Sequence, residues 1–466
     1  MPSEAIETDY LVVGAGATAM AFVDTLLSET ASRIVMVDRR HRPGGHWNDA
    51  YSFVGLHQPA AFYGVASREL GEWRKDETGL NAGFYSLSTK PEVLSHFEQV
   101  MRQRFLPSGR VVFCPMTEYV HDAGAHRLTS LTSGETRIVR TRRFVDATHA
   151  RTEIPSTHPP KYHVAPGVVL VPVNGLPDIR RPYSRYTVIG SGKTGMDACL
   201  WLLQNGVQPE RIRWIMPRDA WLLNRASFQP GAENFETTIG AIVSQLQCVV
   251  EASSVADLFR RLEARGVLMR IDPQVEPTRY RCAIVSREEL GALRSIADIV
   301  RLGRVQAIEP SRLVLDRGQA RAGPDTLYVD CSASAIQSPP AVRVFEGEAI
   351  NLLMVRTCQP LFSAALIAWV EARVAEPSEK NALCEPVPSP ETPADWLRMW
   401  EATLRNTARW RAKPELDAWL QNCRLNSISA SLRGVRRDDT AKFAMLKRAG
   451  DTGAAAAARI PALLAG

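Results

Sequence analysis

The chain has 466 residues, of which 45% are hydrophobic and 23% charged, a balance typical of a globular protein with two or three domains. Its net charge of +6 is small for this length and no run of like charges is present, which argues against a nucleic-acid partner or an anionic membrane. The polar N-terminus does not resemble a secretion signal and no apolar run approaches the roughly 20 residues that span a bilayer, so we expect a cytoplasmic protein. The eight cysteines are scattered, without C-x-x-C or metal-ligand spacing, which argues against a redox-active disulfide and against a metal site.

The first recognisable unit is a strand, a glycine-rich turn and a helix near the N-terminus. Residues 10–13 form an apolar run typical of a buried strand, and the turn G-A-G-A-T-A at 14–19 leads into an apolar helical stretch. Gly14 permits the tight turn, Gly16 lets the backbone approach a pyrophosphate, and Ala19 keeps helix and sheet close. This order predicts a dinucleotide site, against the alternative of a doubly wound domain whose turn binds nothing.

A second predicted strand, 33–38, and the segment after it indicate which dinucleotide binds. The strand ends in Asp38, about where a carboxylate binds ribose hydroxyls. Residues 39–47 read R-R-H-R-P-G-G-H-W, which resembles the G-G-x-W segment of flavin-containing monooxygenases and related flavoproteins. In that family the glycine pair passes beneath the flavin and pyrophosphate, so the resemblance implies FAD; Trp47 is either a flavin contact or a core aromatic. The FAD-binding residues implied in this part are Gly14, Gly16, Ala17, Thr18, Ala19, Asp38, Arg39, Gly44, Gly45, His46 and Trp47.

Residues 186–203 repeat the strand–turn–helix order, with G-S-G-K-T-G at 190–195. The G-K-T triplet is not part of a nucleotide-triphosphatase motif, because that motif needs a glycine where Thr187 stands. The following strand, 211–216, leads to Arg218 and Asp219. A cation at this strand end suits the 2′-phosphate of NADP, whereas an acid suits NAD. We favour NADPH because Arg218 precedes Asp219. Lys193 opposes the helix dipole unless an anion binds, the alternative being a solvated side chain. The predicted NADPH-binding residues are Gly190, Ser191, Gly192, Lys193, Thr194, Gly195 and Arg218.

Together, the two units resemble the two-dinucleotide, glutathione-reductase-like flavoproteins, and specifically their flavin-containing monooxygenase branch, over roughly residues 8–220 and 325–375. Within that resemblance, residues 328–333 look like the strand that returns to the FAD domain, and residues 144–148 look like its earlier counterpart.

The segment 357–363, which opens the apolar helix 364–374, looks like the helix start that faces the flavin in this superfamily. The resemblance therefore implies FAD contacts from Gln359, Phe362 and Ser363. A helix start near the flavin would stabilise its anionic reduced form. The alternative is an ordinary amphipathic helix.

The chain departs from the family pattern in two places. No F-x-G-x-x-x-H signature precedes the second glycine turn, since residues 168–179 carry no histidine. The asparagine beside the flavin is also missing from residues 51–59, which offer His57 instead. His57 is therefore the candidate catalytic residue, as a hydrogen-bond donor or as a proton-transfer group near neutral pH, with a loop-capping structural role as the alternative.

The fold class that we predict is α/β, with two Rossmann-like three-layer dinucleotide-binding domains, a helical insertion and a C-terminal helical segment. The predicted boundaries are 1–165 for the first part of the FAD-binding domain, 180–224 for the NADPH-binding core, 225–303 for the helical insertion on the substrate side, 304–375 for the return to both domains, 376–449 for the C-terminal helices and 450–466 for a flexible tail.

The predicted function is that of an FAD-dependent, NADPH-oxidising oxidoreductase, a monooxygenase that acts on a small organic molecule with molecular oxygen. The alternatives are a flavin dehydrogenase or reductase that does not activate oxygen, and a non-catalytic FAD-binding protein. A disulfide reductase is disfavoured because neither C-x-x-C nor C-x4-C is present. No motif identifies the substrate or the oligomeric state.

Overall fold

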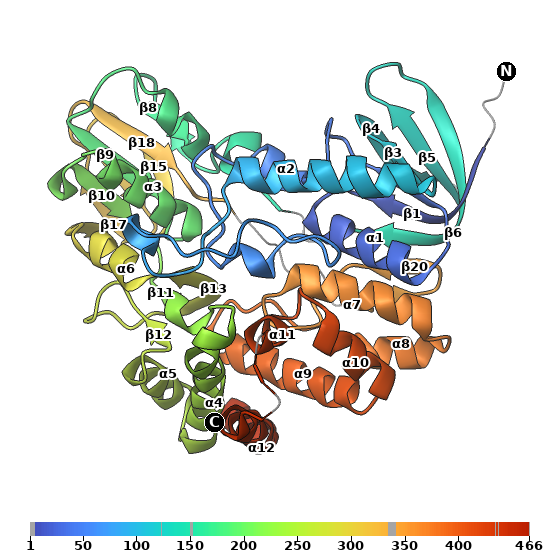
Figure 1. Cartoon of the computed structure of the whole chain (residues 1–466). Helices are drawn as coiled ribbons and strands as arrows, with labels where there is room; N and C mark the ends of the chain where they lie inside the picture. Colours follow the sequence, from blue (N-terminus) through green and yellow to red (C-terminus); the bar gives the residue numbers. More distant parts are fainter. Residues whose placement is uncertain are drawn as a thin grey trace.

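The computed structural model describes residues 5–122, 124–149, 152–333, 342–433, 435–436 and 438–465. Residues 1–4 of the N-terminal segment, residues 334–341 of the predicted return segment and Gly466 lie outside the described residues. Two parallel sheets, each with helices packed on it, lie on opposite sides of the upper part of the molecule, above a block of C-terminal helices (Figure 1). The predicted α/β class with two dinucleotide-type domains is therefore confirmed.

The first sheet carries the first glycine turn, and its strand order is β19-β20-β6-β1-β2-β3. All neighbours in this order are parallel except β19 and β20, which are antiparallel, and a hairpin of β4 and β5 joins the sheet through β5, next to β6. The strands are β1 (Ile6–Val13), β2 (Ile34–Val37), β3 (Val111–Cys114), β4 (Thr117–Asp122), β5 (Ala125–Ser130), β6 (Thr136–Asp146), β19 (Phe345–Glu346) and β20 (Ala349–Asn351).

Side chains on the two faces of this sheet enter different cores, because successive residues of a strand point to opposite faces. Tyr10 and Val12 pack with α1 (Ala17–Glu29), α2 (Lys90–Val100) and α7 (Pro360–Arg373). Leu11, Val35 and Val37 pack with residues of β5 and β6 on the other face. Helices α1 and α7 lie against each other, so a late segment of the chain completes the first domain.

The second sheet is wholly parallel in the order β14-β10-β9-β18-β8. Helix α3 (Lys193–Gln204) packs on one face, and the four-stranded sheet β17-β16-β15-β7 packs on the other. The strands of both sheets are β7 (His163–Val164), β8 (Val169–Pro172), β9 (Arg185–Ile189), β10 (Ile212–Ile215), β14 (Asp298–Val300), β15 (Val305–Ile308), β16 (Arg312–Leu315), β17 (Gly318–Arg321) and β18 (Thr326–Asp330).

The assignment of residues 328–333 to a strand that returns to the FAD domain is wrong. These residues start in β18, which lies beside β9 in the second sheet, and the strand that returns to the first sheet is β20. The register explains the confusion: Asp330 lies opposite Ile189, as Asp146 of β6 lies opposite Val13 of β1. The two strands hold equivalent positions in two similar sheets, so their sequences look alike.

The insertion 225–303 is mixed, and the prediction that it is helical is therefore only half right. Its helices are α4 (Phe235–Glu251), α5 (Val255–Ala264) and α6 (Arg287–Arg294). Between them, β12 (Leu268–Met269) and β13 (Arg279–Val285) form a small sheet with β11 (Ala220–Asn224). The sequence of β13, R-Y-R-C-A-I-V, has the aromatic and β-branched residues that favour strands.

The C-terminal segment is helical as expected, but its end is not loose. It comprises α8 (Pro377–Leu383), α9 (Pro393–Arg411), α10 (Pro414–Asn422), α11 (Ser427–Leu432) and α12 (Thr440–Ala465). Helix α12 covers most of the predicted flexible tail and buries Ala456, Ile460 and Leu463 against α4 and α9. Alanine is the best helix former, and small side chains let two helices approach closely, so the Ala-rich composition builds a helix here. Within the described residues, no helix is both long and apolar enough to cross a bilayer.

Candidate functional site

A cavity of about 1740 Å³ lies between the two dinucleotide-type turns. Thr18 and Trp47 of the first domain line it, as do Gly192 and Arg218 of the second and residues 357–362 at the start of α7. Pockets for a single small molecule are typically about 300–1,000 Å³. The cavity therefore has room for more than one ligand. The sequence-predicted residues that line it are Thr18, His46, Trp47, His57, Gln359, Phe362, Gly190, Ser191, Gly192, Lys193, Thr194 and Arg218. The other predicted site residues are not part of its lining: Gly14, Gly16, Ala17, Ala19, Asp38, Arg39, Gly44, Gly45, Gly195 and Ser363.

The first glycine turn is packed directly against the later glycine pair. Gly14 has φ +98°, and a Cβ there would lie 3.2 Å from Thr148 Cγ2. A Cβ at Gly45, which has φ +54°, would lie 2.8 Å from the Cα of Gly16. The Gly44 N–H donates to Ala15 O at 2.8 Å. The glycine pair is thus needed for the two turns to touch, whatever ligand lies over them.

The start of α1 offers an anion site next to a fixed carboxylate. Gly16 is the N-cap, and among the described residues the helix has no side-chain cap and no acid in its first turn, so its first amides are open to a ligand. Asp38 is buried; its Oδ2 accepts from Ala15 N–H at 2.7 Å and its Oδ1 from Arg40 N–H at 2.8 Å. Each carboxylate oxygen can accept a further hydrogen bond. These residues fit the diphosphate and a ribose of a dinucleotide.

The remaining residues predicted around the first turn differ in their surroundings. Trp47 is buried and donates from Nε1 to Tyr63 Oη at 2.7 Å, so its ring belongs to the core while also bordering the cavity. His46 is exposed and borders the cavity, and desolvation, with Arg40 nearby, lowers its pKa to about 4. The Arg39 side chain is 73% exposed and lies 3.9 Å from Glu118.

At the start of α7, Gln359 is the residue with free hydrogen-bonding capacity. Its Nε2 donates to Ser427 Oγ at 3.0 Å, whereas its Oε1 is buried and has no partner among the described residues. Ser363 Oγ donates to Gln359 O at 2.8 Å and accepts from Val355 N–H at 3.1 Å, so it holds the helix start together. The Phe362 ring packs against Trp410 and beneath the Arg356 guanidinium. The orphaned Gln359 oxygen fits a ligand donor in the cavity.

In the second turn, one of the three glycines faces open space. A Cβ at Gly190 would lie 2.6 Å from Cys331 O, and one at Gly195 would overlap Gly190 O, so both positions are closed by the protein's own backbone. A Cβ at Gly192 would meet nothing within 4 Å among the described residues. Gly192 is also the N-cap of α3, which, in the part of the chain described, has neither a side-chain cap nor an acid in its first turn. This turn fits a diphosphate.

Lys193 is neither a solvated side chain nor an unpaired cation. Its Nζ forms an ion pair with Asp197 one turn later in α3, and Asp197 Oδ2 also accepts from Tyr51 Oη at 2.6 Å. Helix α3 therefore neutralises this charge itself. Ser191 Oγ donates to Arg218 O at 2.9 Å, which ties the glycine turn to the loop after β10.

Sequence reasoning missed three of the four arginines that gather at this end of the cavity. Arg279 and Arg281 on β13 and Arg304 join Arg218 in its lining. Burial, followed by the charges of the other three, lowers the pKa of Arg279 to about 10. A glutamate, Glu391, pairs with Arg279 and Arg281, and Arg279 Nε is buried without a hydrogen-bond partner among the described residues. The R-x-R pattern of β13 is the only sequence signal for this cluster, and it acquires meaning once the fold places it beside Arg218.

The neighbouring acid, Asp219, is occupied. Its two carboxylate oxygens accept from Arg301 Nε at 2.9 Å and Nη2 at 3.1 Å, and its side chain is buried. The acid that would suit a ribose diol is therefore engaged, whereas the four arginines leave an excess of positive charge. This arrangement fits a phosphate group and favours the NADP reading over the NAD reading.

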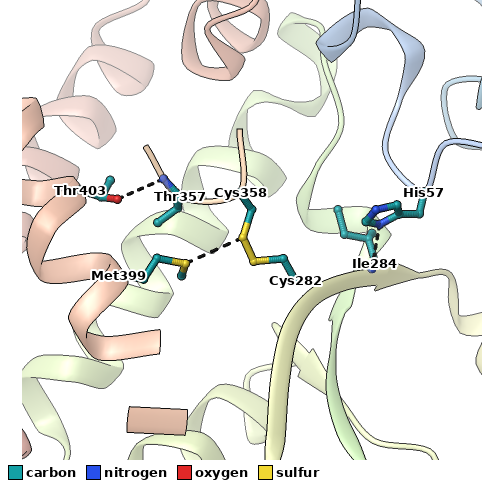
Figure 2. Close-up of a disulfide and its surroundings, with 7 residues drawn as sticks. All are labelled: His57, Cys282, Ile284, Thr357, Cys358, Met399 and Thr403. Carbon is teal, nitrogen blue, oxygen red and sulfur yellow. Dashed lines mark hydrogen bonds between the residues drawn. A yellow bond between two sulfur atoms is a disulfide. The ribbon is translucent and has the colours of Figure 1, made fainter. Parts of the chain in front are cut away.

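His57 lies in the lining of the cavity, and its surroundings do not favour proton transfer near neutral pH. Its Nδ1 accepts from the Ile284 N–H at 3.2 Å, which leaves the proton on Nε2 (Figure 2). Burial, together with the charges of Lys193 and Arg225, lowers the pKa of His57 to about 3. The ring is therefore neutral at physiological pH and can act there as a hydrogen-bond donor.

A disulfide between Cys282 and Cys358 lies in the lining of the cavity. Figure 2 shows this disulfide with its neighbouring residues. It links β13 of the insertion to the loop before α7, with Cα atoms 6.5 Å apart and a sequence separation of 76 residues. Cysteine spacing does not reveal this pair, because C-x-x-C patterns detect only cysteines that are close in sequence. The tertiary structure brings Cys282 and Cys358 together.

Two parallel sheets that each present an open helix start to one cavity define a protein with two dinucleotide-type domains. No family model matches the chain. It is 48% identical over 431 residues to uncharacterized protein Rv2000 of Mycobacterium tuberculosis strain H37Rv, covering 92% of this chain and 79% of that protein. The match to uncharacterized protein Mb2023 of Mycobacterium bovis has the same identity and coverage. The chain belongs to the family of these mycobacterial proteins.

Several solved structures are similar to the chain at low identity. Oxidised steroid monooxygenase bound to NADP has a TM-score of 0.49 at 14% identity, covering 81% of this chain and 88% of that chain. The OTEMO complex with FAD and NADP has a TM-score of 0.49 at 14% identity, covering 80% of this chain and 85% of that chain. The open form of cyclohexanone monooxygenase has a TM-score of 0.46 at 14% identity, covering 81% of this chain and 91% of that chain.

Proposed function

We propose that the protein is an FAD-dependent, NADPH-oxidising oxidoreductase that uses molecular oxygen to oxygenate a small organic molecule. The observation that carries the proposal is that two open, uncapped helix starts, one beside Asp38 and one beside four arginines, border the same cavity. FAD, when bound, supplies the hydride acceptor and the group that reacts with oxygen. The chain supplies binding, orientation and charge.

The first domain would hold FAD. The amides at the start of α1 face the diphosphate, Asp38 accepts from ribose hydroxyls, and Gln359 Oε1 accepts a donor from the ligand at the start of α7. Gly44 and Gly45 keep the first turn in the shape that exposes those amides.

The second domain would hold NADPH. The diphosphate binds at Gly192 and the start of α3, and the 2′-phosphate binds Arg218 with the arginines of β13. Asp219 does not oppose that phosphate strongly because Arg301 neutralises it. His57, neutral and within the lining, donates a hydrogen bond from Nε2 to a bound group.

A reductase that does not activate oxygen is the second candidate, and one observation favours it. The Cys282–Cys358 disulfide lies in the lining of the cavity, so a reductase would have an acceptor other than oxygen within the protein itself.

The test begins with the purified protein after reconstitution with FAD. We expect a yellow protein whose flavin is bleached by NADPH under anaerobic conditions. When the reduced protein is mixed with oxygen in a stopped-flow instrument, oxygenation predicts a transient absorbing species before oxidised flavin returns. Direct reoxidation in one step would favour the reductase. A colourless protein that takes up no FAD in calorimetry would contradict both and favour a non-catalytic binding role.

A further inference from the structure

The Cys282–Cys358 pair has no part in the reaction proposed above. We propose that it is a redox-active dithiol–disulfide site which accepts two electrons from NADPH, an inference that rests on the proposed function because NADPH must bind and react. Three features of the structure support it: the position of the pair, the backbone that presents it, and the charge around it.

The pair lies between the regions assigned to the two cofactors. Cys358 directly precedes Gln359, the N-cap of α7, whose side-chain oxygen is buried without a hydrogen-bond partner among the described residues. Cys282 follows Arg281 of the arginine cluster and lies two residues before Ile284, whose N–H donates to His57. Both cysteines border the cavity, so the disulfide is accessible from the space that the cofactors would fill (Figure 2).

The backbone presents both sulfurs at a conformational cost. Four non-glycine residues of the described chain have positive φ, and two of them are Cys282 at +55° and Cys358 at +47°. At Cys282, β13 bulges: its pairing with β11 passes from Tyr280 to Ile284 while β11 advances only from Trp221 to Leu223. Bulges re-aim side chains, and left-handed non-glycine residues cluster at functional sites.

The chemical surroundings suit a disulfide that is reversibly reduced and reoxidised. Cations stabilise the thiolates formed when a disulfide is reduced, and Arg281, which lines the same cavity, directly precedes Cys282 in β13. The side of Cys358 is lined by soft and neutral groups, with Met399 Sδ 3.9 Å from its Sγ and Thr403 Oγ1 accepting from Thr357 N–H at 3.2 Å. By contrast, burial raises the thiol pKa of Cys331, which also borders the cavity, and of Cys199 far above the usual value.

The proposed step balances without any further reagent. NADPH gives up a hydride, the S–S bond breaks with those two electrons, and one proton from solvent completes the second thiol. The products are NADP⁺ and two cysteine thiols, at Cys282 and Cys358. FAD, if bound as proposed, would supply the route by which these electrons pass from NADPH to the disulfide.

The first measurement counts thiols and needs no variant. Of the eight cysteines, six are free in the structure. The FAD-loaded protein, denatured and treated with a thiol reagent, is therefore expected to show six thiols as isolated and eight after anaerobic treatment with NADPH. Peptide mapping without reductant should find the fragments containing Cys282 and Cys358 joined before the treatment and separate after it.

The second measurement is an anaerobic titration with NADPH followed by flavin absorbance. Full reduction of the natural protein is expected to take two equivalents of NADPH per flavin, and that of the Cys282→Ala, Cys358→Ala double variant only one. Cys248→Ala is the matched control, because Cys248 is buried in the insertion and does not border the cavity. The Cys248→Ala variant should need two equivalents of NADPH per flavin, as the natural protein does.

The outcomes separate this inference from the proposed function. Eight thiols in the protein as isolated, or six both before and after NADPH while the flavin is reduced by one equivalent, would overturn the redox site alone. If FAD does not bind, or NADPH reduces neither the natural flavin nor that of the variant, the proposed function fails and the redox site fails with it.

Discussion

At the scale of single residues, charge around the second glycine turn sets the expected choice of nicotinamide cofactor. Asp219 would bind the two ribose hydroxyls of NADH if it were free, but Arg301 holds both of its oxygens. Arg218 lies one position earlier, exposed at the cavity, where desolvation, followed by the charge of Arg304, lowers the pKa of its guanidinium. Two adjacent residues of opposite charge thus have unequal access to a ligand.

Replacing Arg218 with glutamine is expected to weaken NADPH binding and leave NADH binding nearly unchanged. A hydrogen bond to a charged group contributes about 1.5–3 kcal/mol, which corresponds to roughly 10- to 150-fold in affinity. Calorimetry with both nucleotides measures this difference. Arg260→Gln, an equal change of charge at an exposed position outside the cavity, is the control. Equal losses for NADPH and NADH would contradict the assignment of Arg218 to the 2′-phosphate.

Gly45→Ala should damage the FAD site although it removes no functional group. The new Cβ would lie 2.8 Å from the Cα of Gly16, at a residue with φ +54°. A left-handed alanine alone costs about 1–3 kcal/mol, and the collision with backbone adds to this. Gly347→Ala is a matched control, because Gly347 has φ +59° and a Cβ there meets nothing within 4 Å of the described chain. Urea unfolding and FAD titration should show a clearly larger loss for the Gly45 variant.

His57 should make stability depend on pH below neutrality. Its pKa is about 3 in the folded protein, below the roughly 6.5 of an unfolded histidine, so the unfolded chain binds more protons as the pH falls. The stabilisation by neutral His57 is therefore full above pH 6.5 and is lost as the pH falls from 6.5 toward 3.

The His57→Asn variant keeps an acceptor for the Ile284 N–H and removes the titration. In urea unfolding between pH 7.5 and 5, stability of the natural protein should fall more steeply than that of the variant, by up to about 1.4 kcal/mol per pH unit. His163→Asn, at an exposed position outside the cavity, controls for the general effect of losing a histidine. Parallel slopes for the natural protein and His57→Asn would show that this ring does not control the pH dependence.

At the scale of elements, α12 shows that the last residues belong to the core of the insertion. Ile460 is fully buried, whereas Phe443, in the same helix, is 46% exposed. Ile460→Ala is expected to lower the free energy of unfolding by about 2–5 kcal/mol, and Phe443→Ala to change it by no more than about 0.5 kcal/mol. Chemical denaturation of both variants compares them directly. Similar small effects would mean that α12 is not held in place as described.

The elements that the sequence predicts well are those whose signal is local. The two strand–turn–helix units each consist of consecutive residues, and α9 and α10 lie within the segment 376–449 that is predicted to be helical. The arginine cluster and the Cys282–Cys358 pair are not local: their members come from β13 and from the loops after β10, before β15 and before α7. Nothing short of the assembled fold brings those segments together. The prediction of a flexible tail at the Ala-rich end of the chain is wrong for another reason. This composition suggests disorder, but alanine favours a helix.

At the scale of the whole molecule, one cavity shared by two domains implies that cofactors stabilise the chain as a unit. FAD at 100 times its dissociation constant should add about 2.7 kcal/mol to the free energy of unfolding. FMN lacks the adenosine whose ribose Asp38 would bind, so it should add much less at the same concentration. Thermal unfolding with each ligand measures the difference. Equal stabilisation by FMN and FAD would contradict the assignment of the first turn and Asp38 to the dinucleotide part of FAD.

The strand order also has a consequence for how the chain is made. β6 ends at Asp146, but its neighbour β20 begins only at Ala349, and α7, which packs on α1, follows it. At roughly 5–20 residues per second, a ribosome needs about 10–40 s to cover that interval of about 200 residues. The second sheet lies within the interval and can form during it. The first sheet, whose synthesis begins first, is therefore completed last. The apolar face of α1 that packs on α7 has no partner until α7 has been synthesised.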